Sequence, residues 1–136
     1  MFLDASVLVA ALAGETEAQA IHSAIVESER LATSPLAVFE ASSRIARLRR
    51  IGFDEAYDAA MDFLKSIQVE IRPIDTETGR LAGLCAARYH YLSGHPARLN
   101  MGDCFAYASA RAAGMKLAYK GDDFVHTDIE GQRFGT

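Results

Sequence analysis

The chain has 136 residues, half of them apolar and 24% charged, which indicates one folded domain rather than a disordered segment. Its net charge of −4 argues against a basic, non-specific nucleic-acid-binding protein but leaves a nuclease open, because a bound metal reverses the local charge of an acidic site. No apolar run reaches the roughly 18 residues of a membrane span, and Asp4 arrives too early for a signal peptide. Cys85 and Cys104 lack metal-ligand spacing, so we expect free thiols and a cytoplasmic protein.

Short apolar segments alternate with longer segments that carry helical periodicity. Four segments have the length of buried strands, at residues 1–3, 30–33, 69–74 and 116–119. Six segments are predicted helices, at residues 6–12, 15–29, 34–50, 53–64, 75–91 and 101–113. Ser34-Pro35 and Asn100 are typical helix starts, and in the fifth helix Leu81, Leu84, Cys85 and Arg88 form one side. The segment 120–136 is predicted to be mostly irregular, with room for one edge strand. This α/β order predicts a parallel sheet with helices on both faces.

Acidic residues lie close to the ends of several predicted strands. Ligands bind outside the carboxyl ends of parallel strands, so we expect these acids to meet at one edge of the sheet. Gathered carboxylates repel one another unless a divalent cation compensates, and Mg²⁺ prefers oxygen ligands. Such a site can orient a water molecule for attack on a phosphodiester. The acids, in chain order, are Asp4, Glu40, Asp103, Asp122 and Asp123.

Each acid also has a purely structural explanation. The dipole of the helix that starts near Asp103 is expected to keep that carboxylate ionised, whichever role it has. The structural roles are a helix N-cap for Asp4, a surface ion pair with Arg44 or Arg47 for Glu40, a capping box with Asn100 for Asp103, and turn positions after Gly121 for Asp122 and Asp123.

Three motifs resemble the PIN-domain family, and specifically its VapC-type toxins of type II toxin–antitoxin systems. They are "FLDASVLVA" from residue 2, "SPLAVFEASSRIARL" from residue 34 and "LNMGDCFAYASARAAGMKLAYKGDDF" from residue 99. The resemblance implies a single PIN domain over residues 1–136, folded as a three-layer α/β/α sandwich with a central parallel sheet. It also implies an endoribonuclease that hydrolyses RNA with Mg²⁺, for which Mn²⁺ can substitute.

The resemblance assigns roles to individual residues. It carries the metal-site role to Asp4, Glu40 and Asp103, with Asp4 and Asp103 as direct ligands of the metal. Ser6 matches the hydroxyl residue that hydrogen-bonds to the first acid, although it equally fits a cap of the following helix. Many relatives place the fourth acid in a Thr-x-Asp-x-x-Phe-like stretch. In that stretch the acid stands three residues before the Phe. In this chain the residue three before Phe124 is Gly121, so Asp122 and Asp123 both stay candidates for the fourth acid.

Positive side chains near the acids have two explanations. Arg44, Arg47 and Lys120 are predicted to contact RNA phosphates or an antitoxin, the alternative being ordinary solvated surface charge. The resemblance implies a small VapB-like antitoxin that places an arginine in the acidic cleft, with the helices at 15–29 and 53–64 as candidate docking surfaces. A homodimer or a toxin–antitoxin hetero-oligomer is expected, with no membrane partner.

Two other classes of function compete with this interpretation. One is a metal-dependent DNA nuclease or a phosphatase on a similar sheet, and the other is a non-enzymatic scaffold that only binds a partner. A haloacid-dehalogenase-like phosphatase needs a second Asp two residues after the first, and Ser6 stands there. No glycine-rich phosphate loop follows the first strand. Transfer, ribosomal and messenger RNA all stay open as substrates, as do one or two metals.

Overall fold

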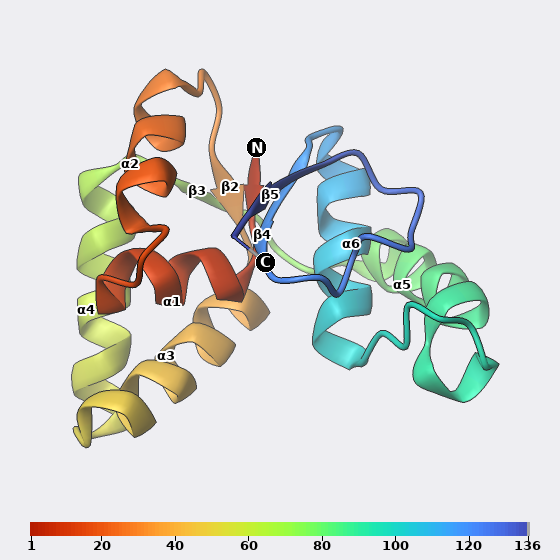
Figure 1. The fold of residues 1–136 in the computed structure, drawn as a ribbon, viewed down its shortest axis with the longest axis horizontal. Helices are drawn as coiled ribbons and strands as arrows, with labels where there is room; N and C mark the ends of the chain where they lie inside the picture. Colours follow the sequence, from red (N-terminus) through yellow and green to blue (C-terminus); the bar gives the residue numbers. More distant parts are fainter. Residues whose placement is uncertain (136) are drawn as a thin grey trace.

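The computed structural model describes residues 1–135, in which five parallel strands form one sheet in the order β3-β2-β1-β4-β5 (Figure 1). From β1 the chain builds the sheet outward through β2 to β3 and then continues on the other side of β1 with β4 and β5. The topological switch point therefore lies between β1 and β4, where ligands of such sheets bind. The strands are β1 (Phe2–Leu3), β2 (Ala32–Thr33), β3 (Glu70–Ile71), β4 (Leu117–Lys120) and β5 (Gly131–Phe134).

Six α-helices connect these strands. Ser34 caps α3 by accepting a hydrogen bond from the Ala37 amide (3.1 Å), and Gly14 and Gly114 end α1 and α6 in the left-handed conformation, as local signals lead one to expect. Thr136, the last residue of the predicted domain, lies outside the described residues. The helices are α1 (Ala5–Ala13), α2 (Ala18–Glu27), α3 (Pro35–Arg49), α4 (Phe53–Ser66), α5 (Thr76–Tyr89) and α6 (Met101–Ala113), with a short 3₁₀ turn at Tyr91–Ser93.

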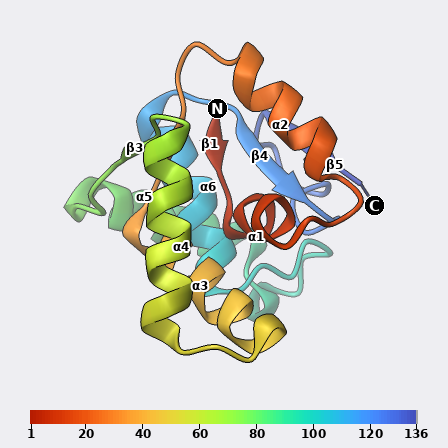
Figure 2. The same cartoon turned by 90° about the vertical axis from the view of Figure 1, so that its left-hand side faces the viewer.

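The helices form layers on the two faces of the sheet. In Figure 1, α1 to α4 lie on one side of the strands and α5 and α6 on the other, and Figure 2 looks onto the layer of α1 to α4. Successive strand residues point to opposite faces: Leu3 and Ala118 pack with the first layer, and Phe2, Leu117 and Tyr119 with the second. This arrangement confirms the three-layer α/β/α sandwich.

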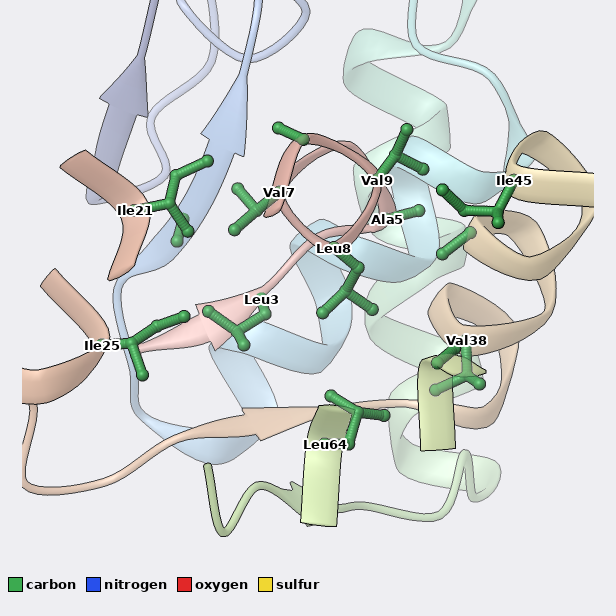
Figure 3. Packing of buried hydrophobic residues seen from close by; sticks show 14 of the residues in the cluster. Leu3, Ala5, Val7, Leu8, Val9, Ile21, Ile25, Val38, Ile45 and Leu64 are labelled. Atoms are coloured by element: carbon green, nitrogen blue, oxygen red, sulfur yellow. The ribbon is translucent and has the colours of Figure 1, made fainter. Parts of the chain in front are cut away.

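The core of the larger layer surrounds α1. Val7 and Leu8 lie among Leu3, residues of α2 such as Ile21, and residues of α3 such as Val38 (Figure 3). The helix is apolar on nearly all sides because neighbours enclose it. Asp4 is the N-cap of α1, so its position is fixed by a tightly packed helix.

The packing of α5 differs from the sequence prediction. Its buried side consists of Thr78, Ala82, Cys85 and Tyr89, whereas the side chain of Leu84 is 58% exposed. Of the side that the periodicity indicates, only Cys85 is buried, because small residues let α5 approach α6 closely. Cys85 is a buried free thiol, as expected, and so is Cys104 of α6. Within residues 1–135, no helix has both the length and the apolar character needed to cross a bilayer.

Candidate active site

Asp4 and Ser6 join the carboxyl ends of the two central strands. Asp4 Oδ2 accepts hydrogen bonds from the Ser6 amide (3.1 Å) and from Ser6 Oγ (2.5 Å). Ser6 Oγ in turn accepts a hydrogen bond from the Lys120 amide at the end of β4 (3.0 Å). The N-cap of α1 is therefore Asp4, and the capping alternative for Ser6 is wrong. Ser6 instead fixes the position of the Asp4 carboxylate across the switch point.

The Asp4 carboxyl is poorly solvated. Burial raises its pKa above the ordinary value, the hydrogen bonds from Ser6 oppose that rise, and the charge of Asp123 adds to it. The site thus holds the carboxyl group firmly, but its hydrogen bonds do not fully offset the cost of burying the negative charge.

Glu40 stands in the second turn of α3, and its carboxylate lies against Gly102 in the first turn of α6. Burial, followed by the charge of Asp4, raises the pKa of Glu40 to about 7, while Arg44 lowers it. Within the described residues, neither Arg44 nor Arg47 comes within 4.0 Å of a carboxylate. The surface ion pair considered for Glu40 is therefore absent, and its carboxylate points to the site.

Asp103 forms the capping box that its spacing from Asn100 predicts. Asn100 Oδ1 accepts from the Asp103 amide (2.9 Å), and Asp103 Oδ2 accepts from the Asn100 amide (3.1 Å). The box uses only Oδ2, so the structural role leaves Oδ1 for a ligand. Burial raises the pKa of Asp103 to about 7, the hydrogen bond from Asn100 opposes this, and the charges of three other acids support it: Asp123, Asp4 and Glu40. Burial and the neighbouring acids thus oppose the helix dipole, which was expected to keep Asp103 ionised.

The exposed acids Asp122 and Asp123 lie in the turn after β4, and they face different surroundings. The charge of Asp123 raises the pKa of both Asp4 and Asp103, and Asp122 has no such effect. Phe124 anchors the turn, because its buried ring packs edge-on against Tyr119 at 5.0 Å between centroids. Of the two candidates, Asp123 is therefore the one whose charge acts on the other acids of the site.

Acids from four segments thus influence one another at the switch point. Among residues 1–135, those with raised pKa values form no ion pair with Lys, Arg or His. No group of three His, Cys, Asp or Glu side chains in the described part of the chain forms a ready-made metal cage. This donor set fits Mg²⁺, which takes one or two carboxylates and completes its coordination with water and phosphate. Asp4 and Glu40 border a narrow crevice between α3 and α6 that Ser34 and Gly102 also line.

The positively charged residues near the site divide into two groups. The Lys120 ammonium forms ion pairs with Glu15 and with Glu17 (3.1 Å), which tie the α1–α2 connection to the end of β4. A contact of Lys120 with RNA or antitoxin, as predicted, requires these pairs to open. Arg44 and Arg47 are exposed and free of such pairs among residues 1–135.

Sequence reasoning missed Gly102, whose missing side chain makes room for Glu40. Its sequence signal is a glycine in the first turn of a helix, directly before an acid, where helix propensity disfavours glycine.

Comparison with known proteins places these features in a family. The sequence profile of the PIN domain matches residues 1–130. A VapC ribonuclease of Rhizobium meliloti strain 1021 is 38% identical over 139 aligned positions, covering 94% of this chain and 98% of the relative. Ribonuclease VapC42 of Mycobacterium tuberculosis H37Rv is 34% identical, covering 95% of this chain and 96% of the relative.

Solved structures share the fold at lower sequence identity. VapC20 of Mycobacterium tuberculosis, described as a sarcin-ricin loop cleaving toxin, matches with a TM-score of 0.71 at 20% identity, covering 94% of this chain and 95% of that one. VapBC2 from Rickettsia felis, solved with a DNA fragment from its promoter, matches with a TM-score of 0.73 at 12% identity, covering 98% and 97%. At these identities the likeness supports the fold alone.

Proposed function

The chain belongs to the PIN domain family, and on that premise we propose that it is a VapC-type toxin, an endoribonuclease that hydrolyses RNA phosphodiester bonds and is held inactive by an antitoxin. The observation that carries the proposal is a set of desolvated, mutually repelling carboxylates at the switch point, those of Asp4, Glu40 and Asp103. The relatives of the chain are named VapC ribonucleases, which supports the same activity.

Asp4 and Asp103 would hold Mg²⁺, or Mn²⁺ in its place, with Glu40 and Asp123 as the adjoining acids. When bound, the metal supplies Lewis-acid stabilisation of the phosphate and lowers the pKa of a bound water. Ser6 keeps Asp4 in place through its hydrogen bonds, and the capping box keeps Asp103 in place. Glu40, with a pKa of about 7, is suited to accept the proton of the attacking water near neutral pH.

Arg44 and Arg47 would contact the phosphates of the RNA. Both arginines are exposed on the helix that carries Glu40, and Arg44 is near enough to lower the pKa of that acid. Free guanidinium groups beside the reacting centre can neutralise the RNA backbone that the acidic chain would otherwise repel. This placement favours phosphate contact over a purely solvating role.

A VapB-like antitoxin is the proposed partner, in a hetero-oligomer or bound to a toxin homodimer, and no membrane partner is proposed. The cluster of carboxylates suits an arginine of the antitoxin, whose guanidinium matches carboxylate geometry. Exposed aromatic residues extend the surface beside it. Phe39 of α3 packs against Phe53 of α4 at 4.9 Å between centroids, with the rings tilted by 46°, and both residues are exposed. With the exposed sides of α2 and α4 they form the candidate docking surface. We also propose a cytoplasmic location, where RNA and such an antitoxin are made.

The proposal is tested by expressing the chain with and without the small open reading frame next to its gene. Wild type alone is expected to arrest growth, the neighbour to relieve the arrest, and Asp4→Asn and Asp103→Asn to be harmless. Purified protein should cleave RNA in Mg²⁺ or Mn²⁺, and not in EDTA. Cleavage of DNA in preference to RNA would favour the DNA nuclease alternative, and toxicity that survives both substitutions would remove the catalytic assignment.

A further inference from the structure

Gly102 is the one glycine within the described α-helices whose missing side chain is required by a neighbour. A Cβ atom built on Gly102 would lie 2.8 Å from both Cδ and Oε2 of Glu40, and nearer still to Oε1. By contrast, a Cβ atom on Gly79 or Gly83 of α5 would meet nothing within 4 Å.

Local helix physics gives no reason for this glycine. Gly102 is the second residue of α6 and is not among the glycines with positive φ, so alanine fits its backbone conformation. Alanine is favoured over glycine within a helix by about 1 kcal/mol. Among the described residues, the three atoms nearest to such a Cβ all belong to the Glu40 carboxylate, so the space that this group fills explains the glycine.

We propose that Gly102 is a positioning residue of the nuclease site, which lets the Glu40 carboxylate approach the first turn of α6 next to Asp103. The inference rests on the proposed function, because it gives the position of Glu40 its purpose. Non-bonded heavy atoms are most stable about 3.5–4.0 Å apart, so a methyl group here displaces the carboxylate by roughly 1 Å.

Two observations indicate that this displacement matters. Asp4 and Glu40 line one narrow crevice together with Gly102, the residue directly before Asp103. Glu40 also lies at the amino end of α6, where the helix dipole favours its negative charge. A displaced Glu40 loses both its alignment with the other acids and the benefit of the dipole.

The first test compares Gly102→Ala with wild type in the full chain. We expect Gly102→Ala to melt at the same or a higher temperature, to bind Mn²⁺ about tenfold more weakly by electron paramagnetic resonance, and to cleave RNA about 10- to 100-fold more slowly. Gly79→Ala is the matched control, because it makes the same change near the start of α5 without a clash. It should melt higher and leave Mn²⁺ affinity and cleavage unchanged.

The second test asks whether Glu40 is the group that Gly102 serves. Glu40→Asp shortens the side chain by one methylene and withdraws the carboxylate from α6. We therefore expect Gly102→Ala to have no further effect on Mn²⁺ affinity in the Glu40→Asp background, which is a non-additive double-mutant cycle.

The outcomes separate the inference from the proposed function. A wild type that cleaves RNA, together with a Gly102→Ala variant that binds Mn²⁺ and cleaves like it, would overturn the role of Gly102 and leave the function standing. Additive losses in the double variant would also overturn it. A wild type that neither binds Mn²⁺ nor cleaves RNA would remove the proposed function, and the inference with it.

Discussion

Ser6 Oγ lies 2.5 Å from Asp4 Oδ2 and donates a hydrogen bond to it, while accepting one from the amide at the end of β4. The two strands that flank the switch point are therefore joined through one hydroxyl group. A hydrogen bond to the charged form of a carboxyl lowers its pKa, which here opposes the effect of burial.

Removing this hydroxyl should make Asp4 harder to ionise. We expect Ser6→Ala to raise the pKa of Asp4 and to shift the pH at which Mn²⁺ binds upward, because the metal needs the ionised carboxylate. Mn²⁺ affinity measured between pH 5 and 9 checks this. Ser42→Ala is the control, since it also removes a buried hydroxyl, one that donates to the Val38 carbonyl within α3. An unchanged pH profile in Ser6→Ala would contradict the prediction.

The raised pKa values of Glu40 and Asp103 also predict how stability depends on pH without metal. Both groups have a pKa of about 7 in the folded chain, against ordinary values of 4.5 and 3.8. Between about pH 4 and pH 7 the folded state therefore holds more protons than the unfolded state, so their contribution to the free energy of unfolding falls as pH rises.

Asp103→Asn tests this sign, because asparagine keeps an oxygen for the capping box but does not titrate. In EDTA at pH 8 we expect the variant to melt roughly 3–6 °C above wild type, and the difference to shrink toward pH 4. Added Mg²⁺ should stabilise wild type at pH 8 and not the variant. A difference in melting temperature that does not change with pH would contradict the assignment.

The choice between the two acids after β4 can be tested as a matched pair. Asp123→Asn should weaken Mn²⁺ binding by about tenfold, because the charge of Asp123 acts on both Asp4 and Asp103. Asp122→Asn removes the same charge one residue away and should leave Mn²⁺ affinity within about twofold of wild type. Equal losses in the two variants, measured by isothermal titration, would show that the turn presents either acid.

Local sequence signals predicted the helix starts and the placement of Asp4 at the end of the first strand. Ser34-Pro35 and the Asn100–Asp103 spacing act within one helical turn, and both caps form as expected. The strand–helix alternation is enough to place Asp4 at the end of a parallel strand. Such features follow from neighbouring residues alone.

Properties that depend on packing were not predictable in this way. The ionisation of Asp103 depends on burial and on acids from three other segments, none of which can be read from the residues around Asp103. The ion pair of Lys120 with Glu15 joins residues 105 positions apart. Which side of α5 is buried depends on how closely α6 approaches it. The hydrophobic periodicity of α5 gives no information about that approach.

The segment that carries Asp123 is attached to the second helical layer through Asp128. Asp128 Oδ1 accepts a hydrogen bond from the Tyr107 hydroxyl (2.5 Å), and Arg111 forms an ion pair with Oδ2 (3.0 Å). The Asp128 amide donates to the Tyr89 hydroxyl (3.1 Å). Residues of α5 and α6 thus fix the position of the segment between β4 and β5.

Tyr107→Phe removes the central hydroxyl while keeping the buried ring. We expect the melting temperature to fall by roughly 3–12 °C, because a hydrogen bond to a charged group contributes about 1.5–3 kcal/mol. Cleavage should slow because the segment bearing Asp123 is held less firmly. Tyr57→Phe is the control, since that ring is 41% exposed and its hydroxyl makes no hydrogen bond within residues 1–135. If Tyr107→Phe lowers the melting temperature but leaves Mn²⁺ affinity and cleavage unchanged, Asp128 supports only the fold. Losses in both, with Tyr57→Phe unaffected, would connect this cluster to the position of the fourth acid.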